Sequence, residues 1–192
     1  MHTEAVKELF LRTGGLLEGH FVYASGRHGR HFLQAARVLQ YPDHTSALCE
    51  AMAQPFAEAR VDLVAGPATG GIILAYETAR ALGCRAVFTE KEADGSMALK
   101  RGFHLKPGTR TLAVEDITTT GGSVRKTIEH LAARGANIVG VACLVDRSGG
   151  AVNFSAPFHP LAQFTLESWP AEECPLCAAG EPTSEPDDLI VT

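Results

Sequence analysis

The stretch TLAVEDITTTGGSV, from Thr111 to Val124, decides the fold. Its apolar run Leu112–Val114 suits a strand that is covered on both faces, as in a parallel sheet. Gly121 and Gly122 then precede a helical pattern. Backbone N–H groups at the start of a helix, together with the helix dipole, attract anions, so we expect a phosphate group in this turn.

Two acidic residues, Glu115 and Asp116, stand at the carboxyl end of the same predicted strand. Carboxylates would repel a phosphate, but they suit the hydroxyl pair of a ribose. A ligand with a 5′-phosphate, free 2′ and 3′ hydroxyls and a metal-bound pyrophosphate satisfies the loop and the acids together, and phosphoribosyl pyrophosphate (PRPP) is such a ligand. The residues of this run expected to bind it are Glu115, Asp116, Ile117, Thr118, Thr119, Thr120, Gly121, Gly122 and Ser123.

This run resembles the signature of the type I phosphoribosyltransferases, in which two acids precede a Thr- and Gly-rich loop that holds the 5′-phosphate. It lacks the Gly-Lys-Ser/Thr ending of a P-loop and is not a GxGxxG motif. The resemblance extends from about Leu9 to Gly150 and, in its details, is to the orotate phosphoribosyltransferases. It implies an α/β fold: a doubly wound, mainly parallel sheet flanked by helices, with a small N-terminal hood.

Composition fits a single globular domain. The chain has 192 residues, 45% hydrophobic and 20% charged, with a net charge of −5. We expect one domain over 1–170, with the hood mainly in 1–42 and the core mainly in 43–150, and a loosely ordered tail over 171–192. The negative charge speaks against nucleic-acid binding, and the lack of a long apolar run speaks against a membrane span. We therefore expect a cytoplasmic protein.

Along the chain, the spacing of apolar residues predicts a helix over 3–12 and a helix from Asp43 that Pro55 ends or kinks. Phe21 and Tyr23, and then the run from Phe32 to Val38, are rich in strand formers. Strands and helices then alternate, as in a parallel sheet. Ligands of such sheets bind beyond the carboxyl ends of the strands, and each motif singled out here falls there.

A second anion site is predicted after the strand VDLVA. Here Ala68, Thr69, Gly70 and Gly71 open a helix, so their N–H groups can meet a pyrophosphate. The resemblance also places a pyrophosphate loop at this point. Many orotate enzymes have lysine where Gly70 stands, so positive charge must come from elsewhere.

The segment from Glu90 to Lys106 supplies positive charge and reads as a long hairpin or lid. Cations closing over the departing pyrophosphate would stabilise the transition state and exclude water. The resemblance implies a lid that acts on the neighbouring subunit's site, and hence a homodimer, with Lys91 at the start of the lid motif. Lys100, Arg101 and His104 are further candidates, although a solvated charged hairpin is an alternative for them.

Two segments suggest the acceptor base. Ser25, Gly26, Arg27 and Phe32 match the hood of orotate enzymes, and Ala24 stands where many members have lysine. Arg147 follows the last core strand, and its planar donors suit an anionic pyrimidine such as orotate. Thr119 could contact the base as well as the phosphate.

The expected reaction is phosphoribosyl transfer from PRPP to N1 of orotate, a step of UMP biosynthesis, with Mg²⁺ on the pyrophosphate and no protein ligand assigned to the metal. The expected catalytic residues are Lys91, Glu115 and Asp116. Lys91 neutralises the pyrophosphate, and the two acids bind the ribose and stabilise the positive charge that develops on it. Transfer to a purine is one alternative. A non-catalytic regulator that senses PRPP and binds nucleic acid is another.

Of five cysteines, Cys49, Cys84 and Cys143 lie in apolar segments and are expected in the core. Cys174 and Cys177 form a single CPLC, half of what a structural zinc site needs. A reduced surface knuckle is the favoured interpretation and zinc the alternative, with His159 as a distant candidate ligand.

Overall fold

The computed structural model describes residues 1–23 and 25–186. Within these residues, a six-stranded sheet has the order β5-β4-β3-β6-β7-β8 and is parallel except for the β4–β5 hairpin. Its strands are β3 (Leu63–Pro67), β4 (Arg85–Lys91), β5 (Met97–Leu99), β6 (Arg110–Thr118), β7 (Asn137–Asp146) and β8 (Phe158–Gln163). The mainly parallel α/β fold expected from the sequence is confirmed.

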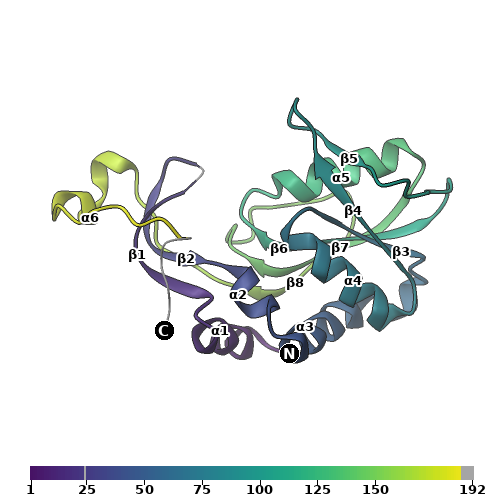
Figure 1. Cartoon of the computed structure of the whole chain (residues 1–192), viewed down its shortest axis with the longest axis horizontal. Helices are drawn as coiled ribbons and strands as arrows, with labels where there is room; N and C mark the ends of the chain where they lie inside the picture. Colours follow the sequence, from purple (N-terminus) through teal and green to yellow (C-terminus); the bar gives the residue numbers. More distant parts are fainter. Residues whose placement is uncertain (24, 187–192) are drawn as a thin grey trace.

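Strand β6 lies in the middle of the sheet, and its apolar run is buried on both faces, as a central parallel strand requires. Leu112 and Val114 face a core cluster that includes Val6, Val38 and Leu74, while Ala113 faces a second cluster with Val124. One face of the sheet is thus covered by four helices and the other by one (Figure 1). The four are α1 (Thr3–Arg12), α2 (Ala35–Leu39), α3 (Pro42–Ala53) and α4 (Gly70–Leu82), and the fifth is α5 (Gly122–Ala133).

A separate antiparallel hairpin, β1 (Leu16–Val22) and β2 (His28–Leu33), forms the hood. The C-terminal segment, with the short helices η2 (Ala171–Glu173) and α6 (Pro175–Ala178), lies beside this hairpin and away from the core (Figure 1). Backbone hydrogen bonds of 2.8 Å in both directions join His28 to Trp169. The N-terminal hood is therefore joined to the segment that follows β8 at Trp169.

Two expectations about local structure are wrong. The run from Phe32 to Val38 is a strand only as far as Leu33, because α2 follows and buries Val38 against the helical core. Of the residues that form α2, Ala35, Ala36, Arg37 and Leu39 favour helix and only Val38 favours strand. The segment 171–186 is not a loose tail, since Cys174 and Leu176 are each only 2% exposed.

Other expectations hold. Helix α1 begins and ends where the spacing predicted, and α3 ends at Ala53, followed by a 3-10 helix, η1 (Gln54–Ala59), that contains Pro55. Ala24 and the end of the predicted tail, 187–192, lie outside the described residues. Among the helices of the described part, none is long and apolar enough to cross a membrane.

Candidate active site

The two acids of the motif lie at the carboxyl end of β6, where the sequence placed them. Glu115 is 7% exposed, and burial raises its pKa to about 9, with a further contribution from the neighbouring charge of Asp116. The backbone N–H of Asp116 donates to Glu115 Oε1 over 3.2 Å, and that of Ile117 donates to Asp116 Oδ1 over 2.6 Å. Glu115 is therefore a neutral carboxyl group at pH 7.

The turn after β6 leads directly into helix α5. Gly121 has a φ of +72°, and a Cβ at that position would lie 3.0 Å from Phe154 and from Val152. Backbone conformation and close packing both require glycine there. Thr119 and Thr120 are exposed on the same turn, so hydroxyls and the N-terminus of a 12-residue helix face solvent together. This geometry suits a phosphate group.

The second predicted anion loop, residues 68–71, contacts Asp116. A Cβ on Gly70 would lie 2.6 Å from Asp116 Cγ and would overlap Asp116 Oδ2, so the carboxylate of Asp116 rests directly on the backbone where α4 begins. Ala68 and Thr69 lead into this point through a cis peptide bond, and the backbone N–H of Ala68 donates to Thr89 O over 2.7 Å. A side chain such as the lysine of other orotate enzymes would collide with Asp116 unless that carboxylate moved.

A cleft of about 530 Å³ lies between the end of β6 and the hood. That volume is within the usual range for small-molecule sites. Its lining residues are Val22, Tyr23, Ser25, Arg27, Phe32, Leu33, Glu115, Ile117, Thr118, Thr119, Thr120, Gly121, Gly122, Ser123, Arg147, Leu166 and Ser168. The predicted donor loop and the predicted base-binding residues therefore face one space.

Arg147 lies at the hood side of this cleft. Its guanidinium carbon is 5.0 Å from the centre of the Tyr23 ring, a cation–π arrangement, and its backbone N–H donates to Thr118 O over 2.7 Å. Its Nε is buried without a hydrogen-bond partner among residues 1–23 and 25–186. A buried donor of this kind calls for an acceptor, which a bound ligand can supply.

The predicted lid is a hairpin of β4 and β5, and its cations are partly engaged. Lys100 pairs with Glu92 at 3.0 Å, and Arg101 makes two bonds of 2.7 and 2.8 Å to Glu90. Lys91 is exposed at the end of β4. The cleft-lining residues of the described chain do not include Lys91, Lys100, Arg101 or His104, nor Asp116 or the loop 68–71.

Comparison with known proteins bears directly on this site. The family model described as "Phosphoribosyl transferase domain" matches residues 37–169. The orotate phosphoribosyltransferase of Thermus thermophilus is 48% identical over 180 residues, which cover 94% of this chain and 98% of that protein. The chain belongs to the orotate phosphoribosyltransferases. The same-named protein of Caldicellulosiruptor bescii is 46% identical over 186 residues, covering 97% of each chain.

A solved member of the family shares the fold. The crystal structure of orotate phosphoribosyltransferase from Aeropyrum pernix has a TM-score of 0.72 and 26% identity, covering 83% of this chain and 93% of that one. The orotate phosphoribosyltransferase fold and the resemblance read from the motif are therefore both confirmed.

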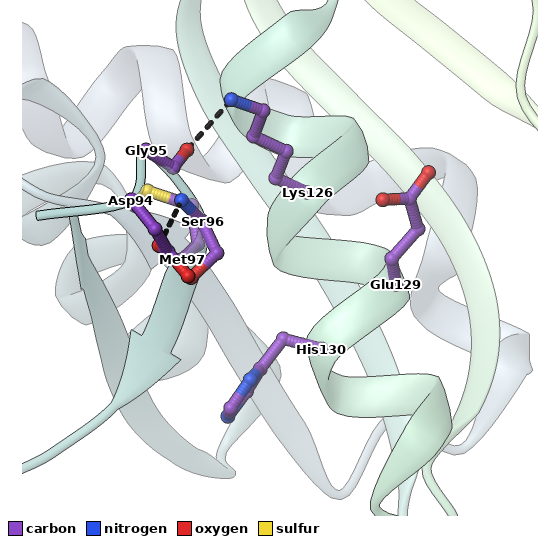
Figure 2. Close-up of a pocket in the computed structure, with 7 residues that line it drawn as sticks. All are labelled: Asp94, Gly95, Ser96, Met97, Lys126, Glu129 and His130. Atoms are coloured by element: carbon purple, nitrogen blue, oxygen red, sulfur yellow. Dashed lines mark hydrogen bonds between the residues drawn. The ribbon is translucent and has the colours of Figure 1, made fainter. Parts of the chain in front are cut away.

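A second hollow of about 470 Å³ lies between the hairpin turn and α5, and the predicted site residues are not part of its lining (Figure 2). Lys126 Nζ donates to Gly95 O over 2.6 Å, and His130 Nε2 accepts from the Leu99 N–H at 3.0 Å. Burial lowers the pKa of His130, with a smaller effect of Arg134, which favours the neutral acceptor form. In this orotate phosphoribosyltransferase these bonds hold the hairpin against its own helix.

Some cleft residues were missed by sequence reasoning. The sequence indicates only a strand former at Tyr23, yet its ring stacks on Arg147 and its hydroxyl donates to His31 O over 2.5 Å. Leu166 and Ser168 reach the cleft from the segment after β8, which carries no motif. The aromatic residue ahead of Ser-Gly-Arg was the one available signal for Tyr23.

Proposed function

We propose that this chain transfers the phosphoribosyl group of PRPP to N1 of orotate in the cytoplasm, giving orotidine 5′-monophosphate and pyrophosphate for UMP biosynthesis. One observation carries the proposal. Glu115 of the acidic pair and the phosphate-sized turn open onto the same cleft as the stacked Arg147–Tyr23 pair. A sugar phosphate and a planar anionic base therefore find complementary groups in one space.

On the donor side, the two acids have different tasks. Glu115, a neutral carboxyl group, both donates to and accepts from the ribose hydroxyls. Asp116 lies over Gly70, between the ribose position and the pyrophosphate loop, where its carboxylate favours positive charge developing on the sugar. The sequence assigned that electrostatic role to both acids, and the raised pKa of Glu115 leaves it mainly to Asp116.

The carboxylate at the donor site is a suitable ligand for Mg²⁺. This ion binds through one or two carboxylates together with substrate phosphates, and Asp116 is the carboxylate that rests on the loop 68–71. We propose that Asp116 and the pyrophosphate oxygens hold it, directly or through water. When bound there, the ion would neutralise negative charge on the pyrophosphate leaving group. The chain's own part is to orient ribose and phosphate so that N1 of the base faces the anomeric carbon.

On the acceptor side, Arg147 is proposed to bind the anionic pyrimidine. Its Nε is buried and available, and Tyr23 fixes the plane of the guanidinium group. Phe32 offers an apolar ring beside the same space, and Thr119 offers a hydroxyl. A planar fork of donors recognises carboxylate and carbonyl oxygens in pairs, which gives orotate an advantage over a neutral purine.

We further propose a homodimer in which the β4–β5 hairpin, with Lys91 and the candidates Lys100, Arg101 and His104, covers the partner's cleft. Ile73 and Tyr76 support an interface on α4, because they are three residues apart on one face and are 47% and 66% exposed. Mass measurement by light scattering tests the dimer. Recovery of activity on mixing a Lys91→Ala variant with an Asp116→Asn variant tests the action in trans.

The deciding experiment is a turnover assay with orotate, adenine, hypoxanthine and xanthine, with and without Mg²⁺. Orotate alone should be consumed, and removal of Mg²⁺ should abolish turnover. Consumption of a purine in preference to orotate would contradict the proposal. So would tight RNA or DNA binding without turnover, the outcome expected of a regulator.

A further inference from the structure

Four metal-binding side chains meet where the hood contacts the C-terminal segment. His20 comes from β1, His28 from β2, and Cys174 and Cys177 flank the start of α6. Their ligand atoms all lie within 4.8 Å of one another. This group is separate from the cleft, since none of the four residues lines it.

The spacing suits a tetrahedral ion. Zinc bonds of about 2.3 Å to sulfur and about 2.0 Å to nitrogen place neighbouring S and N ligands roughly 3.5 Å apart. Here Cys174 Sγ and Cys177 Sγ each lie 3.6 Å from His20 Nε2, and Cys177 Sγ lies 3.3 Å from His28 Nδ1. The two nitrogens are 2.8 Å apart, so a small outward movement of one ring admits the ion.

The surroundings prepare His20 as a ligand. Its Nδ1 lies 2.7 Å from Glu181 O, and a carbonyl oxygen only accepts, so the proton is on Nδ1 and the lone pair of Nε2 faces the cysteines. Zinc-binding histidines are commonly oriented in this way. His20 and Cys174 are each 2% exposed, so these two side chains of the cluster are shielded from solvent.

The backbone also departs from regular geometry at this point. Glu18 pairs with His31 and Phe21 with Gly29, so β1 contains one residue more than β2 over this interval, and His20 lies inside the resulting bulge. Bulges redirect side chains. The His20 and His28 rings end with their centres 5.0 Å apart.

We propose that His20, His28, Cys174 and Cys177 bind one structural Zn²⁺ that fastens the C-terminal segment to the hood. Two thiolates and two imidazoles in tetrahedral array select zinc among common ions, and four protein ligands leave no open position for catalysis. This zinc site takes the place of the reduced surface knuckle that the sequence favoured for Cys174 and Cys177. His159 is not a ligand, since its ring packs edge-on against Phe56 with the centroids 5.2 Å apart.

Zinc here would act on the cleft through the hood. The hairpin that carries His20 and His28 also carries Tyr23 and Phe32, which line the cleft. The Ser184 N–H donates to His20 O over 2.7 Å, so the far side of the segment is tied to the same strand. Releasing the segment would free the hairpin to move relative to the core.

Metal analysis of the full-length protein, purified under reducing conditions without a metal-affinity tag, tests the site. We expect close to one zinc per chain in the wild type and in a Cys84→Ser control, which removes a cysteine outside the cluster. Cys177→Ser and His28→Ala should lose zinc, with affinity falling by more than the roughly 10–100-fold typical of losing an outer-shell partner.

A measurement on the unaltered chain guards against misfolded variants. Co²⁺ added to zinc-free wild-type protein should give the strong visible bands of a tetrahedral ion and thiolate charge-transfer absorption, and Zn²⁺ should displace both. No thiolate absorption, a disulfide between Cys174 and Cys177 in fresh protein, or one zinc retained by Cys177→Ser would overturn the proposal.

A kinetic experiment links the zinc site to the hood. It rests on the proposed function, whereas the measurement of metal content does not. Zinc removal should raise KM for orotate more than it lowers kcat, because the ion positions the hood and touches no reacting atom. Equal kinetic constants with and without zinc would contradict this link to the hood.

Discussion

Replacing Glu115 by glutamine tests the buried neutral carboxyl group. The side chain is 7% exposed, and its pKa is raised from 4.5 to about 9 by burial first and by Asp116 second. Glutamine has nearly the same shape, carries no titratable proton and can still donate to the Asp116 carboxylate. The variant should therefore be more stable than the wild type at neutral and alkaline pH.

The size and sign of the effect follow from the two pKa values. The unfolded chain releases the Glu115 proton above pH 4.5, whereas the folded protein keeps it until about pH 9. The free energy of unfolding of the wild type is therefore unaffected by Glu115 below pH 4.5 and falls as the pH rises from 4.5 towards 9. At pH 7.5, three pH units above 4.5, the penalty is at most about 4 kcal/mol, using about 1.4 kcal/mol per unit. Relaxation around a coupled pair reduces that figure, and a gain of about 1–3 kcal/mol is expected.

Urea unfolding at several pH values between 5 and 9 measures the difference. The advantage of Glu115→Gln should be small at pH 5 and should grow steadily to pH 9. Glu129→Gln, a change of an exposed carboxylate on α5, serves as the matched control and should follow the wild type. A stability difference that does not vary with pH would refute a neutral Glu115.

Three further changes probe the site. Asp116→Asn should lower kcat by about 10²-fold with an unchanged melting temperature, and steady-state rates equal to wild type would remove Asp116 from the mechanism. Gly70→Ala should push the overlapping Asp116 carboxylate by about 1 Å and cost up to about 10²-fold in kcat/KM; a crystal structure with Asp116 unmoved would contradict this cause. Arg147→Lys keeps the charge but loses the planar fork stacked on Tyr23, so KM for orotate should rise about 10-fold or more while PRPP affinity, measured by calorimetry, stays within about twofold.

Local signals in the sequence were sufficient for the core of the fold. The run Leu112–Val114, the acids after it and the glycines before α5 are neighbours in the chain, so their strand, turn and helix could be read directly. The same is true of the turn after β3, where Gly70 and Gly71 open α4.

Features that depend on distant contacts could not be read in this way. His20 and Cys174 are 154 residues apart, and CPLC looked like half a site because its partners lie on the hood. Tyr23 is placed in the cleft by its hydrogen bond to His31 O and by stacking on Arg147, which is distant in the chain. Helix α2 takes its position from Val38, which packs in the core against residues far away in the chain.

A crystal structure of the protein with PRPP and Mg²⁺ tests the donor site most directly. The 5′-phosphate should lie in the turn from Thr118 to Ser123, with the ribose hydroxyls bonded to Glu115 and Asp116 and the pyrophosphate against the loop 68–71. PRPP bound elsewhere, or with its ribose turned away from both acids, would contradict the donor site on which the proposed function depends.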